Sequence, residues 1–282
     1  MNAELGAVLP NFGPDASMES VLRVAEVAEE LGFDSVWTTE HLLVGDEAKE
    51  RYSRTLDAIG CLEFLAARLH HIGLGTSIVI LPLHHPVRLA KEAATLQLSS
   101  GNRLRLGIGV GWHRDEFEFL GVEFAGRWRR ADEAVRLMRA LWAGERSFRG
   151  DHWSFDDAHF GPLPEREPEI WVGGASPRSL RRAREHGATW HPNVADPESV
   201  AAARAEWPQA RIVPRLRVRF SAGRSPLSGT PEEVAAALER LFDAGMAGAV
   251  LGFGDDEHDM VSGMRRFAGE VRPHVPALAS SS

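Results

Sequence analysis

One connection recurs along the chain and constrains its fold more than any other feature. The segments EELGFDSVW (29–37), REHGATWHP (184–192) and FDAGMAGAVLG (242–252) each run from the end of a helical pattern through a glycine into an apolar strand. Glycine at that point accepts the left-handed conformation that ends a helix. Repeated helix–glycine–strand units predict repeated βα modules built around a parallel sheet.

Short segments that are apolar at mostly consecutive positions are predicted to be the strands. Such runs are typical of strands buried on both faces, as in parallel sheets. The candidates are Glu4–Leu9, Ser35–Thr38, Ile72–Ile80, Leu104–Val110, Glu169–Val172, Ala188–His191, Ile212–Phe220 and Gly248–Phe253.

Helical patterns fall between these strands, and about eight of each predict an α/β fold, a (β/α)8 TIM barrel, with a doubly wound open sheet as the alternative. In the clearest helix, Thr230 is the expected N-cap, Pro231 the first helical residue and Glu233 the capping-box partner. One domain is expected over residues 1–282, with residues 144–168 as an insertion at one end of the barrel.

Composition argues against several classes of partner. The net charge of −8 makes nucleic acid an unlikely ligand. The one cysteine, Cys61, allows no disulfide within the chain. Neither a signal-peptide pattern nor an apolar run of about 18 residues is found. We therefore expect a cytoplasmic protein that acts on a small molecule, with no membrane partner.

The chemistry of a (β/α)8 barrel lies where each strand ends and the next loop begins. That rule selects five short segments as candidates for the site. They are Pro10–Gly13, Thr39–His41, Ile78–Pro82, Gly109–Trp112 and Gly173–Ser176.

The stretch EIWVGGASPRSL (169–180) ends a predicted strand at two glycines, which let the backbone turn sharply and approach a ligand closely. Ser176 is the expected N-cap of the next helix, and unpaired N–H groups at a helix start can bind an anion. A phosphate site at Gly173, Gly174, Ala175 and Ser176 is one interpretation, and an ordinary strand-to-helix turn is the other.

The glycines in LRLGIGVGWHRDEF (104–117) recur at every second position, so Gly107, Gly109 and Gly111 fall on one face of a strand. They either leave room for a flat ligand or relieve crowding inside the barrel. Trp112 stands where a dinucleotide fingerprint needs its third glycine, so that motif is excluded. At the end of the strand, Trp112 could form the wall of a pocket.

Glu40 and His41 follow an apolar strand and are expected at the mouth of the barrel. A histidine there can donate a hydrogen bond or transfer a proton near neutral pH, which makes both residues catalytic candidates. A structural histidine–carboxylate pair is the alternative. His84 and His85 are adjacent and form no separated histidine pattern, so no metal site is expected.

Together these segments resemble the luciferase-like monooxygenase family, and most closely its members that use the deazaflavin coenzyme F420. The matching motifs are LPNFG, GFDSVWTTEHL, LGTSIVILPLHHPVRLAKEAATL, NRLRLGIGVGWHRDEFEFLG, RADEAVRLMRALW and IWVGGASPRSLRRA. They span roughly residues 5–195. The remainder shares only the helix–strand rhythm of the family.

The resemblance implies a barrel that holds a flavin-type ring at its C-terminal mouth. It also implies a supporting bulge with a non-prolyl cis peptide, at Ser77-Ile78 or, as the second candidate, at Ile78-Val79. His41 would assist transfer, and Gly173–Ser176 would hold the cofactor phosphate. The residues implied at the cofactor are His41, Ser77, Ile78, Val79, Gly109, Gly111, Trp112, Gly173, Gly174, Ala175 and Ser176.

The sequence departs from the family's pattern at two places. The family often has GDGW where this chain has GATW (Gly187–Trp190), so no role is expected there for the missing aspartate. Some deazaflavin relatives carry a glutamate, thought to move a proton, where this chain has Trp112. Glu40, His113 or Asp115 could substitute for it, or the proton could come from water. Substrate contacts are expected from Asp46–Arg54 and from residues 144–168.

The function implied is hydride transfer between F420 and a small organic substrate, in either direction. The alternative within the family is a monooxygenase that uses reduced FMN and oxygen and depends on a partner flavin reductase. A cofactor-binding protein without turnover is a further alternative. A phosphate-binding isomerase or aldolase has little support, because neither Lys49 nor Lys91 lies well placed at a strand end for a Schiff base. Family members are commonly dimers, so a homodimer is expected.

Overall fold

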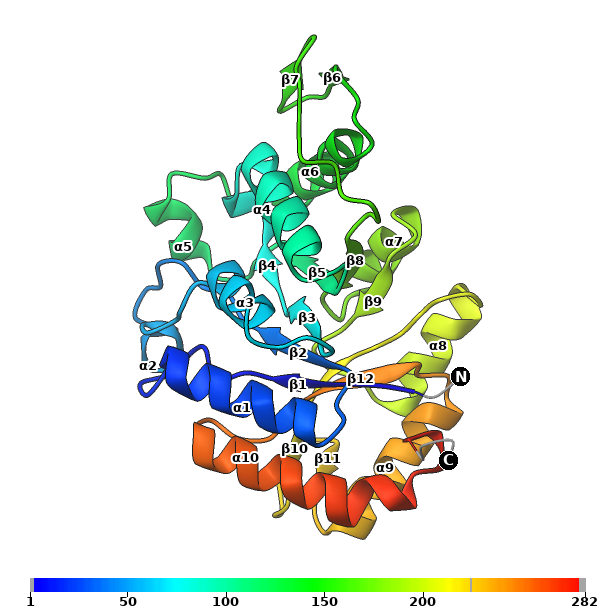
Figure 1. The fold of residues 1–282 in the computed structure, drawn as a ribbon. Helices are drawn as coiled ribbons and strands as arrows, with labels where there is room; N and C mark the ends of the chain where they lie inside the picture. Colours follow the sequence, from blue (N-terminus) through cyan, green and yellow to red (C-terminus); the bar gives the residue numbers. More distant parts are fainter. Residues whose placement is uncertain (1–2, 224, 279–282) are drawn as a thin grey trace.

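Strands and helices alternate along the chain, as Figure 1 shows for the computed structural model, which describes residues 3–223 and 225–278. The strands of the main sheet are β1 (Glu4–Val8), β2 (Ser35–Thr38), β3 (Gly73–Thr76), β4 (Val79–Ile80), β5 (Leu104–Gly109), β8 (Glu169–Gly173), β9 (Thr189–His191), β10 (Arg215–Arg219), β11 (Leu227–Ser228) and β12 (Gly248–Gly252). The α-helices are α1 (Met18–Glu30), α2 (Lys49–Tyr52), α3 (Ala58–Ala66), α4 (Pro86–Ser99), α5 (Arg114–Phe119), α6 (Arg127–Trp142), α7 (Pro177–Glu185), α8 (Pro197–Glu206), α9 (Pro231–Asp243) and α10 (Glu257–Arg266).

The parallel strands close into a ring. Pairing runs in the order β10, β12, β1, β2, β3, β5, β8 and β9. The ring closes where Trp190 of β9 forms a parallel bridge with Ile212, just before β10. Backbone hydrogen bonds from Trp190 N to Arg211 O (2.9 Å) and from Val213 N to Trp190 O (3.0 Å) hold this seam. The predicted (β/α)8 barrel is therefore confirmed, and the open sheet is not adopted.

Two predicted strands differ from the observed ones. The stretch predicted as one strand, Ile72–Ile80, is broken at Ser77-Ile78 into β3 and β4. The strand predicted from Ile212 begins at Arg215. Pro214 lies between them and has no N–H to donate to a neighbouring strand, which interrupts regular pairing there.

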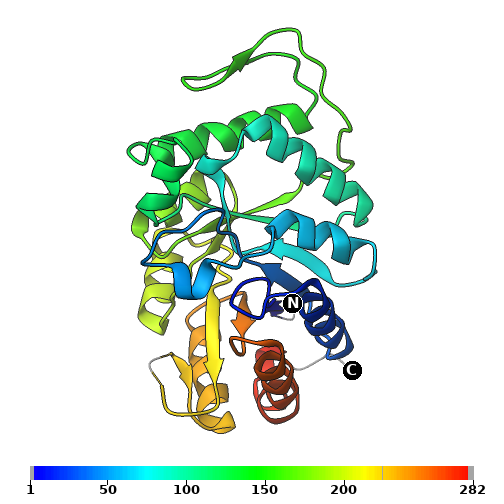
Figure 2. The same cartoon turned by 90° about the vertical axis from the view of Figure 1, so that its left-hand side faces the viewer.

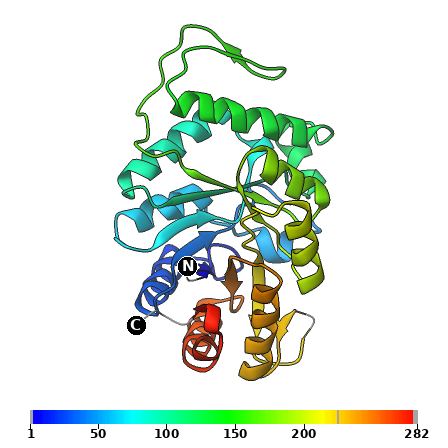
Figure 3. The ribbon, with the colours of Figure 1, turned by 90° about the vertical axis from the view of Figure 1, so that its right-hand side faces the viewer.

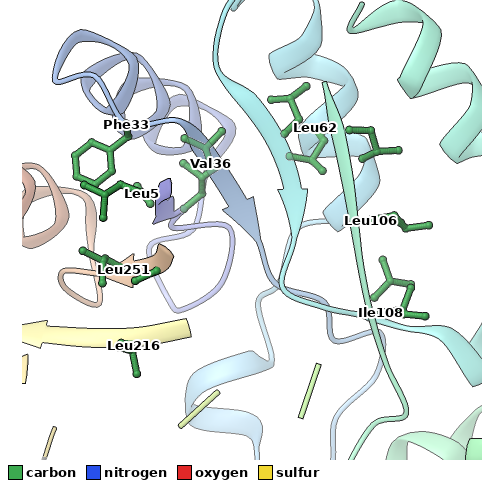
Figure 4. Packing of buried hydrophobic residues seen from close by; sticks show 14 of the residues in the cluster. Leu5, Phe33, Val36, Leu62, Leu106, Ile108, Leu216 and Leu251 are labelled. Carbon is green, nitrogen blue, oxygen red and sulfur yellow. The ribbon is translucent and has the colours of Figure 1, made fainter. Parts of the chain in front are cut away.

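An apolar layer separates the barrel from the surrounding helices. Leu5, Val36 and Leu251, from three neighbouring strands, gather with Phe33 in this layer, which also contains Leu106 of β5 (Figure 4). The helices contribute apolar residues at helical spacing to the same buried cluster. This packing explains why the strands read as nearly continuous apolar runs, because the alternate residues fill the inside of the barrel.

Two tryptophans pack in the interior of the barrel, in a buried cluster with Val8, Phe12, Val213 and Val250. Trp37 and Trp171 are fully buried, with ring centroids 4.5 Å apart. A Cβ atom on Gly6 would lie 2.3 Å from Nε1 of Trp37, and one on Gly75 would lie 2.3 Å from its Cε3. Glycine is therefore required on both sides of the indole, since no side chain fits there.

The helix starts follow the predicted capping chemistry. Thr230 caps α9 by accepting a hydrogen bond from the Glu233 N–H, while the Glu233 carboxylate accepts one from the Thr230 N–H at 2.8 Å. Pro231 is the first residue of the helix, as expected. Ser176 likewise caps α7 by accepting from the Ser179 N–H at 3.2 Å.

The segment predicted as an insertion forms a hairpin outside the barrel. Its strands are β6 (Phe148–Arg149) and β7 (Ser154–Phe155), which pair antiparallel. Figures 2 and 3 show the hairpin standing beyond α6, away from the sheet. Glu133 of α6 anchors its turn by accepting hydrogen bonds from the backbone N–H groups of residues 151–153 at 2.9–3.0 Å. Within the described residues, no helix has the length and apolar character needed to cross a bilayer.

Candidate active site at the carboxyl end of the barrel

A cavity of about 290 Å³ opens at the carboxyl end of the barrel, and we call it the main cavity. Its wall comes from residues at the ends of β2, β3, β5, β8 and β9, together with Arg215 of β10 and Tyr52 of α2. Four of the five segments selected from the sequence contribute to it, the exception being Pro10–Gly13. A larger open groove of about 770 Å³ lies between residues 220–223 and 226–230 on one side and helices α9 and α10 on the other, and no predicted site residue lines it.

The break between β3 and β4 forms a bulge in the wall of the main cavity. Its Ser77-Ile78 peptide is cis, which is the first of the two positions implied by the family resemblance. The Ser77 N–H donates to Thr38 O at 2.7 Å, and the Ser77 hydroxyl lies 2.8 Å from Nε2 of His191. Nη1 of Arg215 donates to Ser77 O at 2.6 Å. The bulge is therefore held from both sides of the barrel.

The strand glycines make room for this bulge. A Cβ atom on Gly107 would lie 1.8 Å from Thr76 O, and Cβ atoms on Gly109 and Gly173 would lie 2.6 and 2.8 Å from the side chain of Ile78. Of the two interpretations of the alternating glycines, relief of crowding is thus borne out at Gly107. Gly109 and Gly173 also line the main cavity.

His41 is held by a carboxylate that the sequence analysis did not select. Its Nδ1 lies 3.0 Å from Oε2 of Glu116, which is fully buried at the start of α5. Burial alone would raise the pKa of Glu116, but hydrogen bonds from His41 and from the Leu42 N–H (2.5 Å) outweigh it and lower that pKa. An ionised carboxylate only accepts, so Nδ1 carries a proton and Nε2 is left for chemistry in the cavity.

Two aromatic rings flank the imidazole of His41. The Tyr52 ring centroid lies 4.1 Å from it, and Trp112 meets it edge-on at 6.0 Å. Trp112 is 54% exposed, so it forms the outer rim of the main cavity, as expected of a pocket wall. His113 faces away and accepts a hydrogen bond from the Gly45 N–H at 2.9 Å, which ties the loop after β2 to the loop after β5.

Glu40 lines the main cavity, but its carboxylate is already engaged. One oxygen accepts from the Ile80 N–H at 2.7 Å, and both lie 3.0 Å from Nε2 of His84. Burial alone would lower the pKa of His84, yet the bond to Glu40 outweighs this and raises it. The geometry corresponds to the alternative role expected of Glu40, a structural histidine–carboxylate pair, formed with His84 rather than with His41.

His191 closes the floor of the cavity as a neutral imidazole. Burial lowers the pKa of His191 to about 4. Its Nδ1 lies 2.6 Å from Val213 O and must donate, so Nε2 accepts from the Ser77 hydroxyl. The ring stacks on Trp37 with centroids 5.3 Å apart. A group that remains neutral and fully bonded positions the bulge and is unsuited to moving protons.

The glycines at the end of β8 lead from the main cavity to the start of α7. Gly174 has a φ of +106°, and its carbonyl accepts from Nε1 of Trp190 at 2.9 Å and from the Ser179 hydroxyl at 2.6 Å. Ala175 and Ser176 are exposed, and their N–H groups donate to no residue in the described part of the chain. This arrangement meets the structural requirements of an anion site at a helix start.

The main cavity brings most of the predicted site residues together. Those that line it are Glu40, His41, Ser77, Ile78, Gly109, Gly111, Trp112, Gly173 and Gly174. Val79 does not, because neighbouring residues of a strand face opposite sides, and it is buried in the outer apolar layer while Ile80 lines the cavity. Ala175 and Ser176 lie just beyond the wall. No group of three or more potential metal ligands is found among the described residues.

Four contributing residues were missed from the sequence, namely Glu116, His191, Asn193 and Arg215, whereas Tyr52 falls within the segment Asp46–Arg54 that was expected to contact the substrate. His191 ends a predicted strand, so the strand-end rule could have found it. Glu116 lies within the charged stretch RDEFEF, where nothing marks one carboxylate as buried. Arg215 lies inside a predicted strand among other arginines, and only the folded barrel distinguishes it.

The model of the luciferase-like monooxygenases matches residues 4–268 of the sequence. The chain belongs to the luciferase-like monooxygenase family. The family resemblance drawn from the motifs is thereby confirmed. It extends through β12 and α10, where the sequence shared with the family only the alternation of helices and strands. Named members that match this luciferase-like chain are enzymes, both dehydrogenases and monooxygenases.

Two relatives show that cofactor use varies within the luciferase-like family. The oxygenase component of a flavin-dependent trigonelline monooxygenase from Acinetobacter baylyi is 29% identical over 174 residues, which are 60% of this chain and 46% of that protein. An F420-dependent glucose-6-phosphate dehydrogenase from Microbacterium testaceum is 33% identical over 177 residues, 61% of this chain and 50% of that protein. The match thus spans about half the length of these relatives.

A solved structure shares the whole luciferase-like fold. The monooxygenase RslO1 from Streptomyces bottropensis superposes with a TM-score of 0.82 and 26% sequence identity. The match covers 96% of this chain and 99% of that one. The likeness therefore extends over nearly the whole of both chains.

Proposed function

We propose that this chain is an oxidoreductase that transfers a hydride between coenzyme F420 and a small organic substrate. The observation that carries the proposal is that the bulge at Ser77-Ile78 and the imidazole of His41 line the same cavity. Ile78 offers an apolar side chain suited to the face of a flavin-type ring. His41 offers a ring nitrogen, Nε2, that makes no hydrogen bond to any described residue.

The start of α7 fits the phosphate of such a cofactor. The free N–H groups of Ala175 and Ser176, together with the helix dipole, favour an anion. Gly173 and Gly174 connect this helix start to the main cavity, so one ligand can extend from the cavity to the helix.

Basic and aromatic residues beyond that helix start favour the deazaflavin, which carries an acidic glutamyl tail. The guanidinium groups of Arg178 and Arg129 lie 5.2 and 5.5 Å from the Trp128 ring. Arg182 is not part of this surface, because it is bound to Asp132 at 2.5 Å. FMN ends at its phosphate and has no group that would use these arginines.

When bound, the deazaflavin supplies the hydride, and the residues of the chain supply orientation and a proton. We propose that Nε2 of His41 donates a proton to the substrate oxygen as a carbonyl carbon gains the hydride, and takes it back in the reverse direction. Glu116 holds Nδ1 and stabilises the charged imidazole. Tyr52 and Trp112 flank the imidazole of His41 and limit the access of water to it.

A monooxygenase that uses reduced FMN and oxygen is the second candidate. It is favoured by the likeness to RslO1 and by Trp112, which stands where some deazaflavin relatives carry a glutamate. Such an enzyme would need a separate reductase to supply reduced flavin. A homodimer is expected for either candidate from the family resemblance, and light scattering would measure it.

A fluorescence titration of the purified protein with F420 and FMN, side by side, tests the proposal. We expect the deazaflavin to bind at micromolar concentration or below and FMN to bind far more weakly. Tight binding of FMN alone would replace the proposal with the monooxygenase. If neither binds, the cofactor assignment is wrong. Binding of F420 without hydride exchange to any acceptor would leave a carrier protein.

A further inference from the structure

A second cavity of about 270 Å³ lies beside the main cavity, and we call it the side cavity. Tyr52, Asn193 and Arg215 line both cavities, so the two share a wall. The rest of the side cavity comes from the ends of β1 and β12, from β10 and from α2 and α10. Neither the Ser77-Ile78 bulge nor the glycines beyond β8 reach it.

Arg215 is half-buried and carries a positive charge without an acidic partner. Only its Nη1 is bonded, to Ser77 O at 2.6 Å and to Thr39 Oγ1 at 2.9 Å. Within the described residues its Nε and Nη2 make no hydrogen bond, and no carboxylate forms an ion pair with it. Burial lowers the pKa of Arg215 to about 10, which leaves it charged at neutral pH.

Arg51, an exposed residue, adds a second unpaired guanidinium to the wall of the side cavity. It lies 5.4 Å from the ring centroids of both Phe12 and Tyr52, and it makes no ion pair in residues 3–223 and 225–278. Repulsion from Arg51 and Arg217 contributes to the lowered pKa of Arg215. The two unpaired arginines therefore act on each other across this space.

The acidic groups nearby do not neutralise the cavity. Asp255 pairs with Arg217, lies 3.4 Å from Arg219 and also feels the charge of Arg51, so one carboxylate serves three arginines. The chain as a whole has a net charge of −8, so this positive site is a local concentration and not a property of the surface. Burying a guanidinium without a partner is costly, and an anion supplied from outside removes that cost.

We propose that the side cavity binds the anionic group of the substrate, a carboxylate, phosphate or sulfonate held by Arg215 and Arg51. The planar guanidinium matches such oxygens with paired donors. Tyr52 contacts the imidazole of His41 and lines the side cavity, so a small molecule anchored there reaches the main cavity beside His41. This inference rests on the proposed function, because it assigns the substrate class of the same site.

The cofactor does not account for the two arginines. The helix start that fits its phosphate lies beyond β8, whereas the side cavity lies at the ends of β1 and β12. Arg51 lines the side cavity only, so its charge is available to a molecule that enters there. Binding of the cofactor ring in the main cavity could explain Arg215, which lines that cavity. It could not explain Arg51, which does not.

The test is isothermal titration of the protein with benzoate and with benzamide, its neutral counterpart. We expect benzoate to bind at least about tenfold more tightly, because paired, charge-assisted hydrogen bonds form only with the anion. Arg51→Gln should lower the affinity for benzoate by about tenfold and leave the affinity for benzamide unchanged. Lys49→Gln is the matched control, since Lys49 is on the same helix but pairs with Asp46 outside the cavity.

Arg215→Gln should abolish the preference for benzoate, with circular dichroism used to confirm folding, because Arg215 also holds Ser77. Equal affinities for benzoate and benzamide, or unchanged benzoate binding in Arg51→Gln, would overturn the proposal. The titration needs no cofactor. Failure of F420 and FMN to bind would therefore reject the proposed function separately, while a lost preference for the anion rejects only this inference.

Discussion

Glu116 accepts a hydrogen bond from Nδ1 of His41 at 3.0 Å, although the two residues lie 75 positions apart. The same carboxylate accepts from the Leu42 N–H, so it fixes both the histidine ring and the backbone next to it. This one contact sets which nitrogen of His41 faces the main cavity.

The first prediction concerns that contact. Glu116→Gln keeps the size of the side chain but removes the charge that stabilises a protonated imidazole. We expect kcat to fall by a factor on the order of 10², while the dissociation constant of the cofactor stays nearly constant. Steady-state kinetics and cofactor titration would be measured on the same preparation. Glu116→Asp should recover part of the activity, and a parallel loss of cofactor binding would contradict the assigned role.

The pair of His84 and Glu40 should make stability depend on pH. The pKa of His84 is raised above its ordinary value of 6.5 in the folded chain, because the bond to Glu40 outweighs burial. The stabilisation is then fully present below pH 6.5 and is lost as pH rises through the raised pKa. Urea unfolding of wild type and His84→Gln would be measured at about pH 5.5 and about pH 8.5. The difference between their free energies of unfolding should be smaller at the higher pH. A constant difference would argue against it.

The inside of the barrel should not tolerate a methyl group at Gly75. A Cβ atom there would lie 2.3 Å from the Trp37 ring, which is enclosed and cannot move aside. Gly75→Ala should lower the free energy of unfolding by about 1–3 kcal/mol. Gly269→Ala is the control, because a Cβ atom there would meet no neighbouring group within 4 Å. Its φ also lies outside the left-handed region, so alanine fits the backbone. Equal stabilities of the two variants would show that the interior is less tightly packed than described.

The turn after β8 should matter for the cofactor phosphate. Gly174 has a φ of +106°, which L-residues rarely adopt, so Gly174→Ala should shift the backbone at the start of α7. We expect weaker binding of F420 and FMN and little change for riboflavin, which lacks the phosphate. An equal loss for all three ligands in fluorescence titrations would place the phosphate elsewhere.

Local patterns were sufficient to predict parallel βα modules and to favour the barrel, with an open sheet left as the alternative. The helix–glycine–strand units, the apolar strands and the caps at Thr230 and Ser176 each depend on neighbours a few positions away, and all are found in the structure. The strand-end rule then located most of the main cavity. It could not reveal that Glu116 rather than Glu40 serves His41, because that choice depends on how two distant loops fold together. The sequence likewise could not show that Arg215 lacks an acidic partner, because which carboxylates lie near it is decided only when the barrel closes.

The seam of the barrel has a consequence for how binding can be observed. His191 and Arg215 stand on the two strands that meet there, and both contact the bulge through Ser77. The seam itself is a short stretch of backbone pairing around Trp190 and Val213. Local opening at this place would disturb the floor of both cavities at once, so a ligand in either one must slow it. The amide hydrogens of Trp190 and Val213 thus report occupancy through their exchange with solvent, without any coloured cofactor or turnover.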